Sequence, residues 1–133
     1  MTTITLKAIE RQYTNNGQHA EQVARYTLTG KIEKADNKPH NFGGDCGDLQ
    51  IKSARATVCK GTDIKAYLED DGANRYGYVT ADFSMMYVMN IDEYITFCTL
   101  FGTVTRESDK NGGATKIRLK SESVAMREWL ANN

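Results

Sequence analysis

One stretch constrains this chain more than any other: a glycine-rich turn that leads into a short run of alternating apolar and polar residues. The stretch spans residues 42–59, and the alternation is clearest over residues 49–52, reading L-Q-I-K. Alternation with a period of two predicts a β-strand, in which side chains two positions apart share a face. Leu49 and Ile51 are therefore expected in a core. The polar positions would share the opposite face: Asp48, Gln50 and Lys52.

These polar residues have the chemistry of a metal-assisted phosphate site. The turn holds two aspartates, Asp45 and Asp48, and three glycines that would let a metal ion or a phosphate approach the backbone. Carboxylate and amide oxygens are ligands for hard divalent cations, and a lysine can stabilise charge near an attacked phosphate. The same pattern also fits a plain hairpin turn followed by a surface strand whose polar face is solvated.

The stretch resembles the core of the PD-(D/E)XK nuclease superfamily, which includes many type II restriction enzymes and phage or repair nucleases. In that family an acidic residue precedes a D/E-x-K tripeptide on a strand, and the tripeptide here is Q-I-K at residues 50–52. The resemblance covers roughly residues 17–79 and implies a single α/β domain over residues 1–133, with a mixed central β-sheet flanked by helices. It implies Asp45 or Asp48 as the first metal ligand, Gln50 as the second, and Lys52 as the catalytic lysine.

The function that the resemblance implies is hydrolysis of DNA phosphodiester bonds by a metal-dependent endonuclease of phage or restriction type. The cofactor would be Mg²⁺ or Mn²⁺, and a homodimer would let two sites address two strands. Gln50 stands where the family usually has an acid, and a neutral ligand binds Mg²⁺ more weakly than a carboxylate. The alternative is therefore a nuclease fold without turnover that serves as a nucleic-acid-binding or protein-binding adaptor.

A helix is predicted over residues 18–29, after an Asn-Asn-Gly turn that offers an N-cap and before Gly30 as the C-terminal stop. Its apolar side would contain Ala20, Val23, Ala24 and Thr27. Glu21 has two interpretations: an i,i+4 ion pair with Arg25, or the auxiliary acid that the family often takes from this helix.

Further elements follow from periodicity and turn residues. The segment at residues 1–13 fits a strand at first and then either strand or helix. Residues 53–58 are expected to continue the strand after Lys52, with a bulge or a strand end near Ser53. The other elements predicted are a short helix at 62–69, strands at 76–80 and 85–89, a capped helix at 90–101, a hairpin with arms at 103–106 and 115–119, and a final helix at 122–131. The inward side of this last helix would contain Val124, Ala125 and Trp129, with Met126 as a further candidate.

Charge is balanced over the chain but not along it. The 17 basic and 17 acidic residues cancel, so bulk electrostatics does not indicate a nucleic-acid binder. Residues 104–120 carry a net charge of +3 and residues 61–93 a net charge of −5. This asymmetry is compatible with one face that approaches DNA and equally with ordinary solvated faces. The candidates for contacts with DNA are Arg55, Lys60, Lys110, Lys116 and Arg118.

The remaining composition narrows the class of protein. Three scattered cysteines without C-x-x-C spacing argue against a disulfide framework and a zinc site, and they fit a reducing compartment. No apolar run approaches the roughly 20 residues of a membrane span, and no secretory leader is evident. We therefore expect a cytoplasmic protein that does not enter a membrane.

Overall fold

The fold is taken from a computed structural model that describes residues 1–34, 48–53, 57–60, 74–106 and 115–133, with the backbone alone at 57–60, 104–106 and 115–116. The candidate residues Asp45, Arg55 and Lys110 and the helix predicted at 62–69 lie outside these ranges.

A mixed four-stranded sheet, called sheet A, forms the centre of the fold. Its strands are β1 (Thr2–Thr5), β5 (Met85–Asn90), β4 (Arg75–Val79) and β2 (Leu49–Ser53), in that spatial order. β2 runs parallel to β4, and the other neighbours are antiparallel. The predicted mixed sheet flanked by helices is confirmed.

A second sheet, called sheet B, contains β3 (Thr57–Lys60), β7 (Thr115–Leu119) and β6 (Gly102–Arg106) in that spatial order, all antiparallel. β2 thus ends at Ser53, where the sequence predicted an end or a bulge, and the chain continues into a strand of the other sheet. The predicted hairpin forms β6 and β7.

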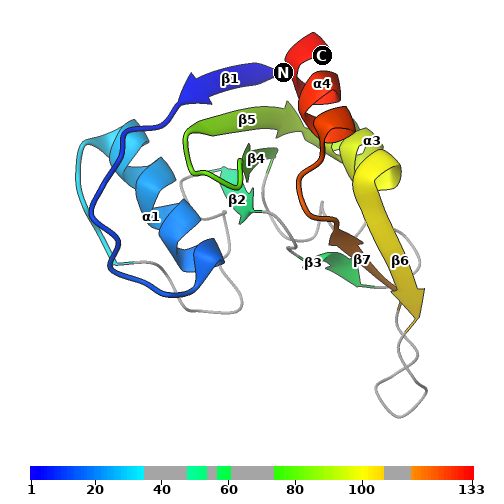
Figure 1. Ribbon diagram of the computed structural model, residues 1–133, viewed down its shortest axis with the longest axis horizontal. Coiled ribbons are helices and arrows are strands. Elements are labelled where there is room, and N and C mark those ends of the chain that lie inside the picture. The colour runs from blue at the N-terminus through cyan, green and yellow to red at the C-terminus, as the bar shows by residue number, and fades with distance from the viewer. Residues whose placement is uncertain (35–47, 54–56, 61–73, 107–114) are drawn as a thin grey trace.

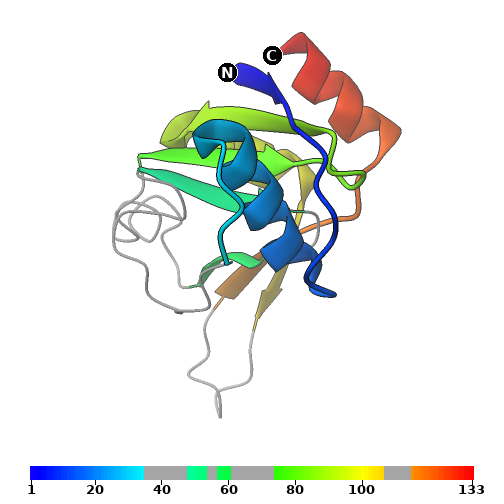
Figure 2. The ribbon, with the colours of Figure 1, turned by 90° about the vertical axis from the view of Figure 1, so that its left-hand side faces the viewer.

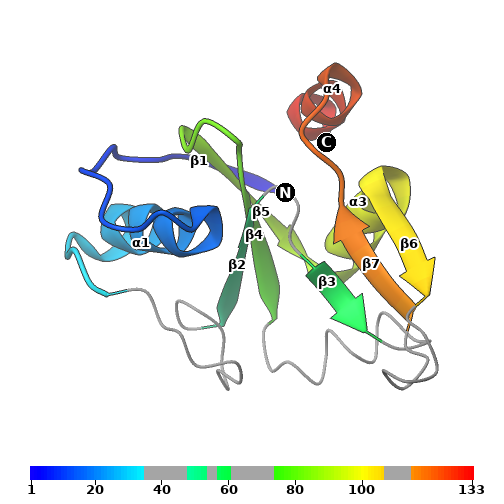
Figure 3. The same cartoon turned by 60° about the horizontal axis from the view of Figure 1, so that its bottom comes forward.

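The helices cover sheet A on both faces. α1 (Asn16–Thr29) packs on one face, while α3 (Ile91–Phe101), α4 (Val124–Asn132) and sheet B lie on the other, as Figure 3 shows. Two apolar clusters fill the two interfaces. The α1 cluster centres on Ala20, Val23, Ala24, Leu49, Ile51, Val79, Met86 and Val88. The other centres on Tyr76, Tyr78, Met89, Tyr94, Phe97, Cys98, Ile117, Leu119, Met126 and Leu130.

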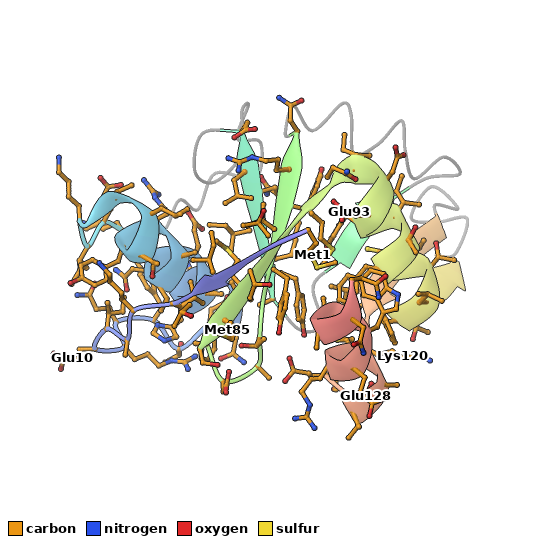
Figure 4. All side chains as sticks on the ribbon, turned by 90° about the horizontal axis from the view of Figure 1, so that it is seen from above. Met1, Glu10, Met85, Glu93, Lys120 and Glu128 are labelled. Atoms are coloured by element: carbon orange, nitrogen blue, oxygen red, sulfur yellow. The ribbon has the colours of Figure 1, made fainter. Side chains whose placement is uncertain are left out.

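Local capping signals set the helix ends as predicted. The Asn15 side chain accepts a hydrogen bond from Gln18 N at 3.0 Å, and Gly30 ends α1 with φ of 75°, a left-handed conformation that favours glycine. Asn90 and Glu93 form a complete capping box at the start of α3. Figure 4 shows Met1 beside Glu93, whose carboxylate pairs with the terminal ammonium at 2.9 Å.

The segment between β1 and α1 is not helical. It passes along the outside of α1 (Figures 1 and 2), with Lys7 N donating to Thr27 Oγ1 at 2.9 Å and Gln22 Nε2 donating to Gln12 Oε1 at 2.8 Å. This segment buries part of the outer side of α1, and the side chain of Gln22 is therefore only 1% exposed.

The final helix differs from its prediction. It begins at Val124 with Ser123 as N-cap. Val124 and Ala125, both predicted inward, are exposed, while the further candidate Met126 is buried together with Leu130. Two positions along a helix correspond to a rotation of about 200°, so Val124 and Met126 cannot both face the core. The larger side chains at Met126 and Leu130, with Trp129 packed at their edge, take the inward side.

Candidate functional site

Strand β2 lies at the edge of sheet A and presents two different faces. Leu49 is 2% exposed and Ile51 7%, and both pack in the cluster under α1, whereas Gln50 and Lys52 are half-buried. The alternation predicted from the sequence is confirmed at each of these four positions.

Gln50 and Lys52 lie on the face of sheet A that looks toward α3. The parallel register pairs Gln50 with Tyr76 and Lys52 with Tyr78, and residues paired in this way share a face. Both tyrosines belong to the cluster packed against α3 and α4. The neighbourhood of Gln50 and Lys52 is therefore aromatic and largely apolar.

The side chain of Gln50 carries an unsatisfied acceptor. Its Oε1 atom is buried and has no hydrogen-bond partner among the described residues. A buried acceptor without a partner costs about 1 to 3 kcal/mol, so each such atom in a native protein calls for an explanation. A water, a metal ion or a ligand atom at this oxygen would remove the cost.

Asp48 is held in a two-point ion pair with Arg75. Arg75 Nε donates to one carboxylate oxygen at 3.0 Å and Nη2 to the other at 2.8 Å, and the Asp48 carbonyl accepts from the backbone N–H groups of Asn74 and Arg75. The side-chain hydrogen bonds from Arg75 lower the pKa of the Asp48 carboxyl. Both side chains are about half exposed, so the pair remains accessible to solvent.

Glu21 occupies the opposite side of the sheet. It is 6% exposed on α1, and Arg25 Nη1 lies 3.4 Å from its Oε1, while Arg25 Nη2 makes a short contact with Glu33. The ion pair is thus present as one interpretation predicted. Because α1 covers the face of Leu49 and Ile51, the structure does not bring Glu21 together with Gln50 and Lys52.

Two of the predicted DNA-binding segments meet in sheet B. The β3–β7 register places Lys60 opposite Lys116 and Thr57 opposite Arg118, although these strands are far apart in the sequence. The Arg118 side chain is exposed, and so is that of Lys120, which follows β7. The fold therefore gathers basic positions that the sequence shows only as separate segments.

Sequence reasoning missed two charged residues near β2. Arg75 pairs with Asp48 only because β4 lies beside β2, and Glu122 faces the buried hydroxyl of Tyr78, the neighbour of Lys52. Burial, followed by the Glu122 charge, raises the pKa of Tyr78 well above its usual value. Among the described residues, neither the buried Tyr78 hydroxyl nor the buried Glu122 Oε1 has a well-formed hydrogen bond. No local sequence signal marks either partnership.

Among the residues that the structure describes, no three histidine, cysteine, aspartate or glutamate side chains are grouped so that they could hold a metal ion. The described helices include none that is long and apolar enough to cross a membrane.

Comparison of the chain with protein-family models, with curated proteins and with solved structures found no match in any of the three.

Proposed function

We propose that this chain is a metal-dependent DNA endonuclease whose site lies at the edge strand β2. The observation that carries the proposal is that Gln50 and Lys52 lie half-buried on the same face of β2. The Gln50 Oε1 atom has no hydrogen-bond partner among the described residues, and Asp48 comes directly before the strand. An acceptor without a partner, a carboxylate and a lysine within five residues are a suitable set for a cation and a phosphodiester.

Each residue would have a separate role. Gln50 Oε1 and a carboxylate oxygen of Asp48 would hold the metal ion, with Asp45 as the further ligand that the resemblance suggests. The bound Mg²⁺ or Mn²⁺ supplies a Lewis acid and lowers the pKa of a coordinated water. Lys52 would place its ammonium group near the attacked phosphate and offset the negative charge that develops there.

Arg75 would act as a competitor for Asp48. Its guanidinium occupies both carboxylate oxygens, so metal binding at Asp48 requires at least one of these hydrogen bonds to open. The pair is half exposed, and an exposed ion pair of this kind opens at little cost. A released guanidinium would be available to bind phosphate in a two-point geometry.

The basic positions in sheet B would contact the DNA backbone. Arg118 and Lys120 are exposed, and Lys60 and Lys116 occupy paired register positions on the neighbouring strands. Contacts of this kind supply affinity that falls with salt concentration and do not read sequence. A homodimer would bring two β2 sites to the two strands of a duplex.

A second function has an observation in its favour. Arg75 already neutralises Asp48, and Gln50 brings no charge, so the described part of the site has weak electrostatic attraction for a cation. A chain with this fold that binds DNA or a protein without cleaving would need only the basic positions of sheet B.

A nicking assay on supercoiled plasmid separates the two functions. The assay compares the wild type, Lys52→Ala and the control Lys31→Ala, which removes an exposed lysine beyond α1, with Mg²⁺, Mn²⁺ or a chelator. Metal-dependent nicking that is lost in Lys52→Ala and kept in Lys31→Ala would support the endonuclease. If folded wild-type protein cleaves neither methylated nor unmethylated plasmid but retards it in a gel, the binding function takes its place.

A further inference from the structure

A small pocket opens at one end of sheet A, on the opposite face from Gln50 and Lys52. It has a volume of about 50 Å³ and is lined by Asn16, Ser53, Thr80, Ala81 and Phe83. Ser53 ends β2 and Thr80 follows β4, so the pocket lies at the carboxyl ends of the two parallel strands. In sheets with parallel strands, ligands commonly bind at this end.

The size of the pocket suits a small polyatomic ion. A cavity needs roughly 10 to 15 Å³ on the same measure to hold one water molecule. A volume of about 50 Å³ therefore takes three to five water-sized groups. A tetrahedral oxyanion with four oxygens has this size.

Ser53 supplies a hydroxyl without a hydrogen-bond partner in the part of the chain that the structure describes. The residue is only 9% exposed, it lines the pocket, and its side chain makes no hydrogen bond with any described residue. Alternation along β2 places Ser53 on the same face as Leu49 and Ile51, toward α1. A hydroxyl of a buried residue that borders a pocket is a ready donor to an anion there.

The first turn of α1 supplies further donors. Asn15 satisfies the N–H groups of Gln18 and His19, through its side chain and its carbonyl. Asn16 lines the pocket at the first turn, and the first N–H groups of a helix have no partner within the helix, where the helix dipole also favours an anion. Asn16 Oδ1 accepts from Arg11 Nη2 at 2.5 Å, so the Asn16 NH₂ group stays available as a donor.

Two opposite charges flank the pocket. The Arg11 guanidinium is fixed by the carbonyls of Tyr13 and Thr14 and lies 5.5 Å above the Phe83 ring. The Asp82 carboxylate accepts from Thr80 Oγ1 at 2.8 Å and from Ser84, and these hydrogen bonds lower the pKa of Asp82. Because the two charges oppose each other, hydrogen bonds rather than net charge would hold an anion, and millimolar affinity is expected.

Phe83 gives the pocket a fixed wall. Its φ of 59° is unusual for a bulky residue, and such a conformation persists only where the surroundings enforce it. The enforcing contacts are the His19 ring, edge-on at 4.6 Å, and the Arg11 guanidinium.

We propose that this pocket binds a phosphate group through Ser53, Asn16 and the first N–H groups of α1. The proposal does not rest on the proposed nuclease activity, because the pocket and the Gln50 and Lys52 positions lie on different faces of sheet A. The phosphate could belong to free inorganic phosphate or to the end of an oligonucleotide, and the hydrogen-bonding chemistry is the same for both.

Calorimetric titration with inorganic phosphate at constant ionic strength tests the proposal. We expect saturable binding by the wild type and by Ser121→Ala, a control that removes an exposed serine hydroxyl elsewhere. Ser53→Ala should bind about 10-fold or more weakly, the loss for one hydrogen bond to a charged ligand. Asn16→Asp should abolish binding by repulsion while its melting temperature stays equal or rises, because a carboxylate at this helix end is favourable and pairs with Arg11.

Competition identifies the source of the phosphate. Displacement by a 5′-phosphorylated oligonucleotide and not by its unphosphorylated form would support the pocket and assign it to a nucleic-acid end. Displacement by neither would support the pocket as a site for the free ion. The proposal is overturned if the wild type shows no saturable binding up to about 20 mM phosphate, or if Ser53→Ala and Asn16→Asp both bind as tightly as the wild type.

Discussion

Replacing Gln50 tests the unsatisfied oxygen on which the proposed site depends. Gln50→Leu keeps a similar side-chain volume and removes the buried Oε1 atom that has no partner among the described residues. The desolvation cost of that atom is about 1 to 3 kcal/mol, so its removal should stabilise the protein by about 1 to 2 kcal/mol. For a domain of this size, that gain corresponds to a rise of roughly 3 to 8 °C in melting temperature.

Gln50→Glu is the matched variant with the opposite expectation. It introduces a carboxylate at a half-buried position, where burial disfavours the charged form and raises the pKa of the new group. An acid whose folded pKa is raised contributes its stability at low pH and loses it as pH rises above its unfolded pKa of about 4.3. At pH 7.5 without metal, we therefore expect a loss of about 1 to 3 kcal/mol relative to wild type.

Urea denaturation of the three proteins at pH 7.5, with and without 10 mM Mg²⁺, measures both effects. Added Mg²⁺ should stabilise Gln50→Glu most, wild type less and Gln50→Leu least, because position 50 offers a carboxylate, an amide oxygen and no oxygen ligand in these three proteins. If Gln50→Leu unfolds at a lower urea concentration than wild type without metal, the oxygen is already satisfied and the reasoning fails. Equal responses of Gln50→Glu and Gln50→Leu to Mg²⁺ would remove Gln50 from the proposed metal site.

Three further outcomes follow from the fold. Gly102→Ala should destabilise the protein by about 2 kcal/mol or more in urea denaturation, because the added Cβ would lie 2.4 Å from the Cys98 carbonyl oxygen. A urea midpoint equal to that of the wild type would contradict this contact. Burial and the nearby Arg11 lower the pKa of His19, so the folded state disfavours its protonated form, and stability should fall as pH drops from 7.5 through 6.5 toward the lowered pKa. In His19→Gln, the melting temperature should fall less over this pH range than in the wild type. An equal fall in both proteins would show that His19 does not cause the pH dependence. Ser123→Ala should cost about 1 kcal/mol through loss of the cap to Met126 N, while Ser123→Asp should keep wild-type stability in the same assay.

The features that the sequence predicted correctly are those set by neighbouring residues. The two faces of β2, the Asn15 cap and the Asn90–Glu93 capping box each depend on contacts within a few positions, so their patterns can be recognised without the fold. The final helix shows the limit of this reasoning. Val124 and Met126 are both apolar, and only the position of the core decides which of them faces inward.

The candidate site depends on contacts that no local pattern contains. Asp48 and Arg75 are 27 positions apart, and they meet because β2 pairs in parallel with β4, a pairing that the sequence does not reveal. Glu21 also depends on the fold: its helix forms where the sequence predicted it, yet α1 packs on the face of sheet A opposite to Gln50 and Lys52. Knowledge of strand order was therefore needed to separate the residues that share a surface with Lys52 from those that do not.

Strand order also explains why one short strand borders two candidate sites. Consecutive residues of β2 point to opposite faces, so Lys52 looks toward α3 and Ser53 toward α1. β2 is the edge strand of sheet A and ends at Ser53, where the first turn of α1 and the turn after β4 meet. A phosphate held at Ser53 and a phosphodiester held at Lys52 would thus lie on either side of a single strand. Substitutions at these two neighbouring positions would separate the two proposed activities, because each side chain contributes to only one of the surfaces.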